Sequence, residues 1–342
     1  MKIRELLIFL KFLCRATVST SHPLLAHLVV TRRCNLSCTY CNEYDKVSEP
    51  IPLDMMKRRI EALARLKTSV VTCTGGEPLL HPDLEIIIEH VRKHGMVVTL
   101  ITNGYLLTKE RIERLNQAGL QELQISIDNI EPDDVSHKSL KVLDKKLQLL
   151  ARHARFKVNI NSVMGVSEDR TQDAVIIAKR AKGYGFSSTV GLLHDENGIL
   201  KPLSKTQREV YDEIGKLSRS FVHFVNYHVF QKKLIEGKIN RWKCRAGARY
   251  LYICEFGQVH WCSQQRGYPA IPVNEYTMED IKREYRTHKN CSTYCTVSCV
   301  HQMSYLDQWR SKQTIPDPTS EEVKDRQVLE EAAEITVQQD AS

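Results

Sequence analysis

The chain has 342 residues and a mass of 39.4 kDa, enough for one large α/β domain with a smaller module. Its formal net charge is +8, but the Lys and Arg residues form no dense tract with interleaved aromatic residues, which argues against nucleic-acid binding. Nine of the eleven cysteines fall into two groups, at positions 34–41 and 244–299, a pattern too clustered for a secreted disulfide scaffold.

Residues 1–22 are predicted to form an apolar, basic helix. Apolar side chains recur there at helical spacing, at Ile3, Leu6, Leu7, Leu10 and Leu13. The run is too short and too charged to span a bilayer, and it lacks the features of a cleavable signal peptide. Two alternatives stay open: a helix lying in a membrane interface, or a helix packed on the protein's own barrel.

From residue 25 to about 200, short β-type runs alternate with helical ones. The predicted strands are His27–Thr31, Ser69–Thr74, Met96–Thr102, Gln121–Asp128, Lys157–Val163 and Ser187–Leu193. The predicted helices are Leu53–Lys67, Pro82–His94, Thr108–Ala118, Ser139–His153 and Thr171–Tyr184. Strands separated by helices of this length favour parallel pairing through right-handed crossovers. Six such units predict an open partial barrel over residues 23–200.

Three cysteines, Cys34, Cys38 and Cys41, follow the first predicted strand with the spacing Cys-x3-Cys-x2-Cys. Thiolates suit iron–sulfur clusters or zinc, and a cubane cluster is normally held by four cysteines. Three close cysteines therefore leave one iron open, where a small molecule can bind and receive an electron. A zinc knuckle, a disulfide or coincidence are the alternatives, but no partner that would complete a zinc site lies nearby in the sequence.

Further motifs follow the next strands. In parallel α/β sheets, ligands gather at the carboxyl ends of the strands. Gly75, Gly76, Glu77 and Pro78 come directly after the second predicted strand. Glycines let the backbone approach a ligand closely, and Glu77 can anchor the loop. By itself the motif also fits an ordinary tight turn.

The cysteine run, with Tyr40 directly before its third cysteine, resembles the signature of the radical S-adenosylmethionine (radical SAM) superfamily, and Gly75–Pro78 matches a second motif of that family. The resemblance implies that the amino and carboxylate groups of S-adenosylmethionine chelate the open iron of a [4Fe-4S] cluster. Reductive cleavage then gives methionine and a 5′-deoxyadenosyl radical, which abstracts hydrogen from a substrate. It also implies a (β/α)6 partial TIM-type barrel, in agreement with the strand and helix pattern.

The resemblance further implies roles for individual residues. The cluster ligands and catalytic centre are Cys34, Cys38 and Cys41. The S-adenosylmethionine-binding residues are Tyr40, Gly75, Gly76, Glu77, Pro78, Asn103, Ser126 and Asp128. For the last three, a turn or a helix cap is the ordinary alternative. We also expect an electron donor such as flavodoxin or ferredoxin, and a cytoplasmic location with possible peripheral contact at the inner face of the membrane through residues 1–20.

After a helical connection at residues 201–240, a second cysteine group begins. Cys244 and Cys262 flank a predicted hairpin, Arg249–Ile253 and Gln258–Trp261, with Gly257 at its turn. Three more cysteines recur every fourth residue, at Cys291, Cys295 and Cys299. In a helix they would share one face, and in a loop they would wrap a cluster.

The spacing Cys-x12-Gly-x4-Cys from Cys244 to Cys262 resembles the SPASM and twitch extensions of radical SAM enzymes, which carry auxiliary iron–sulfur clusters. The cysteine block here is shorter than that of a full SPASM domain. One auxiliary [4Fe-4S] cluster is therefore expected in a hairpin-plus-helix module at residues 241–312, held by Cys244, Cys262 and two of the last three cysteines. A structural zinc site stays open, as does a core or ligand role for Cys254. Residues 313–342 are expected to form a flexible polar tail.

Three hypotheses for the function follow. The first is radical modification of a peptide or protein side chain. The second keeps the radical chemistry but takes a membrane-linked lipid, a glycolipid or another anionic small molecule. The third is a cluster-bearing electron carrier without radical catalysis, against which the complete Gly-Gly-Glu-Pro motif argues.

Overall fold

The computed structural model describes residues 12, 14–164, 170–192, 200, 203–217, 226–236, 238, 240, 242–291 and 295–311. The predictions for residues 1–11 and for the tail at 313–342 lie outside these ranges. In the described part, no helix is both long and apolar enough to cross a membrane.

Six parallel strands alternate with helices, as predicted. The strands are β1 (Leu25–Thr31), β2 (Val70–Gly75), β3 (Val97–Thr102), β4 (Glu122–Ile127), β5 (Lys157–Met164) and β6 (Ser187–Leu192). The helices are α2 (Leu53–Arg65), α3 (Leu84–Lys93), α4 (Lys109–Ala118), α5 (Leu140–His153) and α6 (Asp173–Gly183), with a short 3₁₀ turn η1 (Pro78–Leu80) after β2. The predicted elements are confirmed, with small shifts at their ends.

Local sequence explains where helix α4 begins and ends. Helix α4 begins after Thr108, whose side chain accepts a hydrogen bond from the backbone N–H of Arg111 at 3.1 Å. It ends at Gly119, which has a φ of +85° and so adopts the left-handed conformation that glycine tolerates best. The residues that flank the helix therefore supply both its start and its stop signal.

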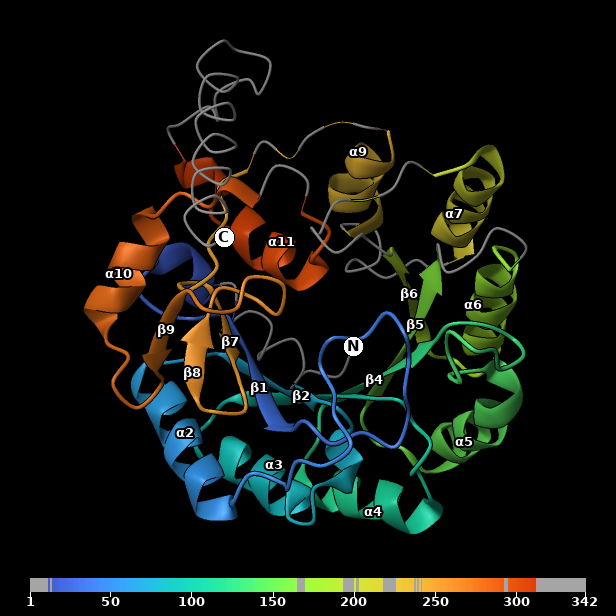
Figure 1. Ribbon diagram of the computed structural model, residues 1–342, viewed down its shortest axis with the longest axis horizontal. Helices are drawn as coiled ribbons and strands as arrows, with labels where there is room; N and C mark the ends of the chain where they lie inside the picture. Colours follow the sequence, from blue (N-terminus) through green and yellow to red (C-terminus); the bar gives the residue numbers. More distant parts are fainter. Residues whose placement is uncertain are drawn as a thin grey trace, which may run out of the picture.

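The curved sheet has an apolar outer face and a polar inner face. Helices α2 to α6 cover its outside (Figure 1). One side of each strand packs on these helices, through residues such as Leu28, Val71, Leu100, Ile125 and Ile160. Alternate residues point the other way. Parallel strands covered on both faces are normally apolar on both, so a polar inner face indicates contact with water or a polar ligand.

Hydrogen bonds join the inner-face side chains of neighbouring strands. The hydroxyl oxygens of Thr72 and Thr99 are 2.7 Å apart. Further along the sheet, the Asn159 amide donates to Gln124 at 3.2 Å and to Thr189 at 2.9 Å. The inner wall thus presents hydroxyl and amide groups rather than a hydrophobic core.

The cysteine-rich C-terminal region extends the same sheet. β7 (Tyr250–Ile253) pairs in parallel with β1, and β8 (Gln258–His260) and β9 (Pro269–Pro272) continue antiparallel. The strand order is β6-β5-β4-β3-β2-β1-β7-β8-β9. The predicted hairpin is confirmed, with Gly257 at its turn at a φ of +81°. Its pairing with β1 was not predicted, because strands so far apart in the chain leave no local signal.

Helix α2 supports this C-terminal hairpin from outside. The guanidinium of Arg59, a buried residue, donates to the carbonyl of Glu255 at 2.8 Å, and Arg65 donates to the carbonyl of Asn274 at 3.0 Å. The hairpin is therefore fixed both to the barrel sheet and to its helical layer.

Helical segments complete the described chain. They are α7 (Lys205–Leu217), a π-helix η2 (Asn226–Gln231), α9 (Lys232–Ile235), α10 (Met278–Arg286), α11 (Ser298–Tyr305) and η4 (Gln308–Arg310). Helix α7 packs beside α6, and the stacked rings of Tyr211 and Tyr227 tie it to η2 with centroids 4.2 Å apart. The described residues between 203 and 236 are largely helical, while the division of the chain into domains stays a prediction.

A buried ion pair ties the start of the chain to the C-terminal region. Arg249 and Asp307 have fully buried side chains, with Nε and Oδ2 2.7 Å apart. Arg249 also donates to the backbone carbonyls of Ala16, Ser19 and His22 at 2.6, 2.8 and 3.0 Å. Residues 16–22 therefore pack on the protein itself, as in the second alternative for the N-terminal segment.

Candidate active site

The Cys34–Cys41 loop lies at the carboxyl end of β1 and is held by backbone contacts. The N–H of Cys34 donates to the carbonyl of Asp45 at 3.0 Å, and the N–H of Cys41 donates to the carbonyl of Cys38 at 3.1 Å. Lys46 Nζ donates to the carbonyl of Cys34 at 3.1 Å. Burial raises the pKa of the Cys34 and Cys41 thiols. These contacts fix the path of the loop that carries the three sulfurs.

The two glycines after β2 pack against the segment that leads into this loop. A Cβ on Gly75 would lie 2.1 Å from the Thr31 carbonyl oxygen, and one on Gly76 would lie 2.2 Å from the Arg32 carbonyl oxygen. In addition, the N–H of Gly76 donates to the carbonyl of Thr31 at 2.9 Å. The glycines were expected to allow close approach to a ligand. The structure shows that they also allow close approach to the backbone just before Cys34.

Glu77 anchors the motif, as predicted. Its carboxylate is fully buried and accepts three hydrogen bonds: from Thr102 Oγ1 at 2.6 Å, from the N–H of Asn103 at 2.7 Å and from the N–H of Leu79 at 2.9 Å. Burial raises the pKa of Glu77, and these hydrogen bonds oppose that shift. Pro78, also buried, opens the short turn η1. One carboxylate thus joins the ends of β2 and β3.

Asn103 connects β3 to the cysteine loop. Its side-chain amide donates to Asn35 Oδ1 at 2.8 Å and lies 3.8 Å from Cys34 Sγ. The sequence placed Asn103 at the same edge of the sheet as the cysteines. The structure brings Asn103 into direct contact with Cys34 and Asn35 of the cysteine loop.

A buried polar network lies on the other side of the loop. The hydroxyl of Tyr40 and that of Ser136 both donate to the carboxylate of Asp128, the latter at 2.5 Å. Lys138 Nζ donates to the Tyr40 oxygen at 2.6 Å and is 3.5 Å from Asp128 Oδ2. Ser136 Oγ also lies 3.6 Å from Cys38 Sγ. Tyr40 and Asp128 were predicted site residues, and the network joins them.

Sequence reasoning missed Ser136 and Lys138. Both lie in the connection between β4 and α5, where the only sequence signal is the length of the connection.

Two of the predicted site residues, Asp128 and Ser126, have polar atoms with which a ligand could still form hydrogen bonds. Asp128 Oδ1 is buried without a hydrogen-bond partner among the described residues, and Ser126 is a partly exposed inner-face residue opposite Asn161.

Four cysteines of the second group gather in the C-terminal region. Burial raises the pKa of Cys244 to about 11 and that of Cys262 to about 12. Burial also raises the pKa of Cys295 well above its usual value, and Cys244, Cys262 and Cys291 raise it further. Cys244 and Cys291 also raise the pKa of Cys262, so the thiols of this group influence one another's ionisation.

The other two cysteines of the region are placed differently. Cys299 lies within α11, and burial raises its pKa to about 11 while a hydrogen bond with Tyr250 opposes the shift. Cys295 precedes α11, so the three regularly spaced cysteines do not share one helix. Cys254 is fully buried at the end of β7, where its N–H donates to the carbonyl of Gln258 at 3.0 Å.

Two further contacts near the cysteines were not predicted. Lys289 is buried beside Cys244, and its ammonium donates to the Glu284 carbonyl at 2.5 Å. The hydroxyl of Tyr252 on β7 donates to Glu43, two residues after Cys41. The second contact links the cysteine loop directly to the C-terminal hairpin.

Comparison with known proteins identifies the family. Residues 28–198, half of the chain, match the family model described as the radical SAM superfamily. The chain therefore belongs to the radical SAM superfamily, and its members found among the relatives are enzymes.

Two curated relatives illustrate the match. The chain is 32% identical over 186 residues to the GTP 3′,8-cyclase of Aquifex aeolicus, an alignment covering 49% of this chain and 56% of that protein. It is 36% identical over 121 residues to the PqqA peptide cyclase of Bradyrhizobium diazoefficiens, covering 34% and 32%. The chain thus spans about half or less of the length of these relatives.

Two solved structures share the fold. Streptococcus suis SuiB bound to S-adenosylmethionine superimposes with a TM-score of 0.58 at 16% identity, covering 86% of this chain and 75% of that one. The structure of anSMEcpe with bound AdoMet and Cp18Cys peptide gives a TM-score of 0.53 at 14% identity, covering 84% and 98%. At these identities the likeness establishes the partial-barrel fold.

Family membership settles the class of protein and its main cofactors. The chain is an enzyme, so the electron-carrier hypothesis is set aside, and the family uses a [4Fe-4S] cluster with S-adenosylmethionine. The residues present fit both groups. Three thiols on one loop are soft donors suited to iron, and the unpaired buried Oδ1 of Asp128 offers an acceptor for a polar ligand.

Proposed function

We propose that Cys34, Cys38 and Cys41 hold three irons of a [4Fe-4S] cluster, and that the enzyme modifies a peptide or protein side chain. The observation that carries the first part is the contact between Thr31–Arg33, which lead into the cysteine loop, and the Gly75–Pro78 motif at the carboxyl ends of β1 and β2. When bound, the reduced cluster supplies the electron that cleaves S-adenosylmethionine to the 5′-deoxyadenosyl radical, which takes hydrogen from the substrate.

The protein's own part in this chemistry is placement. The backbone carbonyls of the Gly75–Gly76 segment are proposed to accept hydrogen bonds from the amine of S-adenosylmethionine, with Glu77 holding that segment rigid. Asn103, Ser126 and Asp128 are proposed to bind its carboxylate and ribose hydroxyls. Tyr40 reaches Asp128 from the cysteine loop, so the cluster-binding loop and the ribose-binding edge are coupled.

We propose further that Cys244, Cys262, Cys291 and Cys295 hold one auxiliary [4Fe-4S] cluster in a SPASM- or twitch-like module. This set leaves out Cys299 because Cys299 lies within α11 and pairs with Tyr250, whereas Cys295 precedes the helix. The buried ammonium of Lys289 would offset part of the negative charge of such a cluster.

Iron content tests this ligand set. Anaerobic reconstitution of the native chain should give about eight irons per molecule. The Cys295→Ala variant should fall toward about four irons, whereas Cys299→Ser should keep about eight, because its thiol pairs with Tyr250 instead. The reverse order would reassign the ligand, and about four irons with bound zinc in the native chain would favour the zinc alternative.

Two observations support a peptide substrate. One matched relative is a PqqA peptide cyclase, and the fold resembles that of SuiB bound to its precursor peptide SuiA, with a TM-score of 0.56 at 16% identity over 88% of this chain and 76% of that one. A small electron donor such as flavodoxin or ferredoxin would supply the electron.

A second candidate substrate is an anionic small molecule. The relative with 32% identity over 186 residues is a GTP 3′,8-cyclase, whose name gives it a nucleotide substrate. The net charge of +8 would favour such a molecule as well.

One assay separates these candidates. Reconstituted, reduced protein with S-adenosylmethionine is incubated with the low-molecular-mass peptide fraction of a cell extract, with a nucleotide mixture, or with a lipid extract. A peptide substrate should raise 5′-deoxyadenosine formation above the uncoupled background, and prior protease digestion of the fraction should remove the effect. Stimulation that resists protease, or that follows the nucleotides or lipids, would contradict the peptide assignment.

A further inference from the structure

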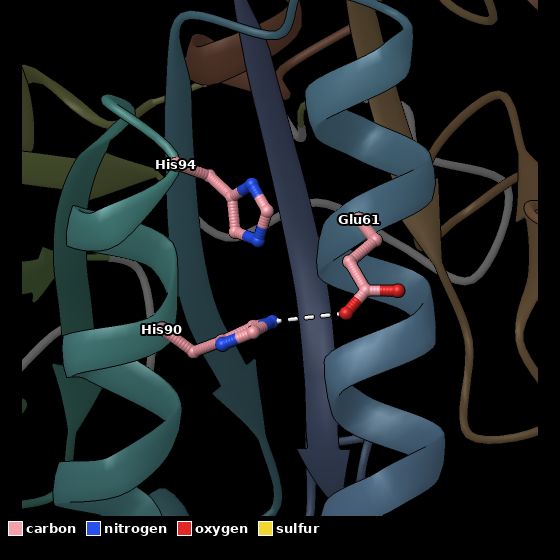
Figure 2. Close-up of side chains that lie close together, drawn as sticks. All are labelled: Glu61, His90 and His94. Carbon is pink, nitrogen blue, oxygen red and sulfur yellow. Dashed lines mark ion pairs between the residues drawn. The ribbon is translucent and has the colours of Figure 1, made fainter.

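Outside the active site, three side chains with metal-binding groups converge on the outer helical layer. Glu61 lies on α2, and His90 and the helix-ending His94 lie one turn apart on α3. Figure 2 shows all three turned toward the same space between the two helices. Their ligand atoms all lie within 4.8 Å of one another.

The spacing already approaches that of a coordinated ion. Tetrahedral zinc, with bonds of about 2.0–2.2 Å to nitrogen and oxygen, holds its ligand atoms about 3.4 Å apart. His90 Nε2 and Glu61 Oε1 are 3.4 Å apart. His90 is the more buried of the three, whereas Glu61 and His94 are exposed and free to make the small remaining adjustment.

We propose that Glu61, His90 and His94 form a Zn²⁺ site, completed by water on its exposed side. Two imidazoles and one carboxylate are a ligand set that suits zinc. The ordinary alternative is a surface ion pair between Glu61 and His90. An ion pair needs only one histidine, and the rings of His90 and His94 have centroids 4.7 Å apart, so a second imidazole faces the same space.

One nearby cation has a carboxylate partner of its own. Lys57, one turn before Glu61 on α2, has its own carboxylate partner in Asp54 at 3.9 Å.

Such an ion would join α2 to α3. The position matters because α2 also supports the C-terminal hairpin, through Arg59 and Arg65 on either side of Glu61 in sequence. A ligand that binds only the folded protein stabilises it. The zinc would therefore act as a structural link in the layer on which the hairpin rests.

The test uses the reconstituted protein, because its cysteines are then occupied by iron. Native protein and the Glu61→Gln/His94→Ala double variant are dialysed anaerobically against the same low concentration of zinc chloride, and bound zinc and iron are measured by mass spectrometry. The native protein should hold one more zinc per chain than the variant at equal iron content. His153→Gln, at the far end of α5, is the matched control and should keep the zinc.

Thermal unfolding provides a second readout on the same samples. Zinc should raise the Tm of the native protein and of the His153→Gln control, but not that of the double variant. Both replaced side chains are exposed, so the variant is expected to fold, and His94→Ala alone serves if its iron content falls. Equal zinc in native and variant protein, or the same Tm shift in both, would overturn the proposal.

Discussion

Replacing Cys34, Cys38 and Cys41 together with alanine is expected to abolish the cleavage of S-adenosylmethionine. The three thiols are the only cysteines on the loop at the carboxyl end of β1, so the variant has no soft ligands there to hold iron. Release of 5′-deoxyadenosine under anaerobic reduction should fall to the background level. The proposed auxiliary ligands lie in another region, so their iron–sulfur absorbance should remain.

A single exposed thiol elsewhere provides the control for this variant. Cys14 is exposed and distant in sequence from both cysteine groups, and Cys14→Ala should leave cleavage unchanged. Cleavage that persists in the triple variant would remove the catalytic assignment. Loss of all iron–sulfur absorbance would show instead that the two regions do not assemble independently.

Replacing Glu77 with glutamine is expected to destabilise the protein by about 2–3 kcal/mol. The buried carboxylate accepts from a hydroxyl and from two backbone N–H groups, through both of its oxygens. An amide of the same shape must turn its NH₂ group toward one of these donors and leave that donor unpaired. For a chain of 342 residues, an unfolding entropy of about 0.7 kcal/mol/K means that this loss should lower the Tm by about 3–4 °C.

The same substitution at an exposed site shows what the chemical change alone does. Glu113 on α4 is exposed, and its ion pair with Lys109 is long at 3.9 Å, so Glu113→Gln should change the Tm by less than about 1 °C. If both variants unfold at the same temperature, Glu77 does not anchor the motif. We also expect Glu77→Gln to weaken binding of S-adenosylmethionine, measurable by equilibrium dialysis.

Much of this architecture could be predicted because each strand and helix has a recognisable local sequence pattern. Each parallel strand and helix carries its own periodicity, and parallel pairing sends every strand end to one edge of the sheet. This rule predicts that Cys34, Glu77, Asn103 and Asp128 lie at the same edge of the sheet. The structure adds the contacts that join them, above all those of Glu77 with β3.

The remainder depends on contacts between distant parts of the chain. Ser136 and Lys138 join the site only because the connection after β4 folds back onto the cysteine loop. The pairing of β7 with β1, and the link from Tyr252 to Glu43, also have no local signal. Similarly, the equal spacing of Cys295 and Cys299 does not show that only Cys299 lies within α11.

In the proposed site, the protein leaves one iron of its cluster free for S-adenosylmethionine. The most direct test is the electron paramagnetic resonance spectrum of the reconstituted, reduced protein, recorded before and after S-adenosylmethionine is added. The cluster signal of the native protein should change when S-adenosylmethionine is added. The triple cysteine variant should show no such change. Identical spectra with and without S-adenosylmethionine, or a response that persists in the variant, would contradict it.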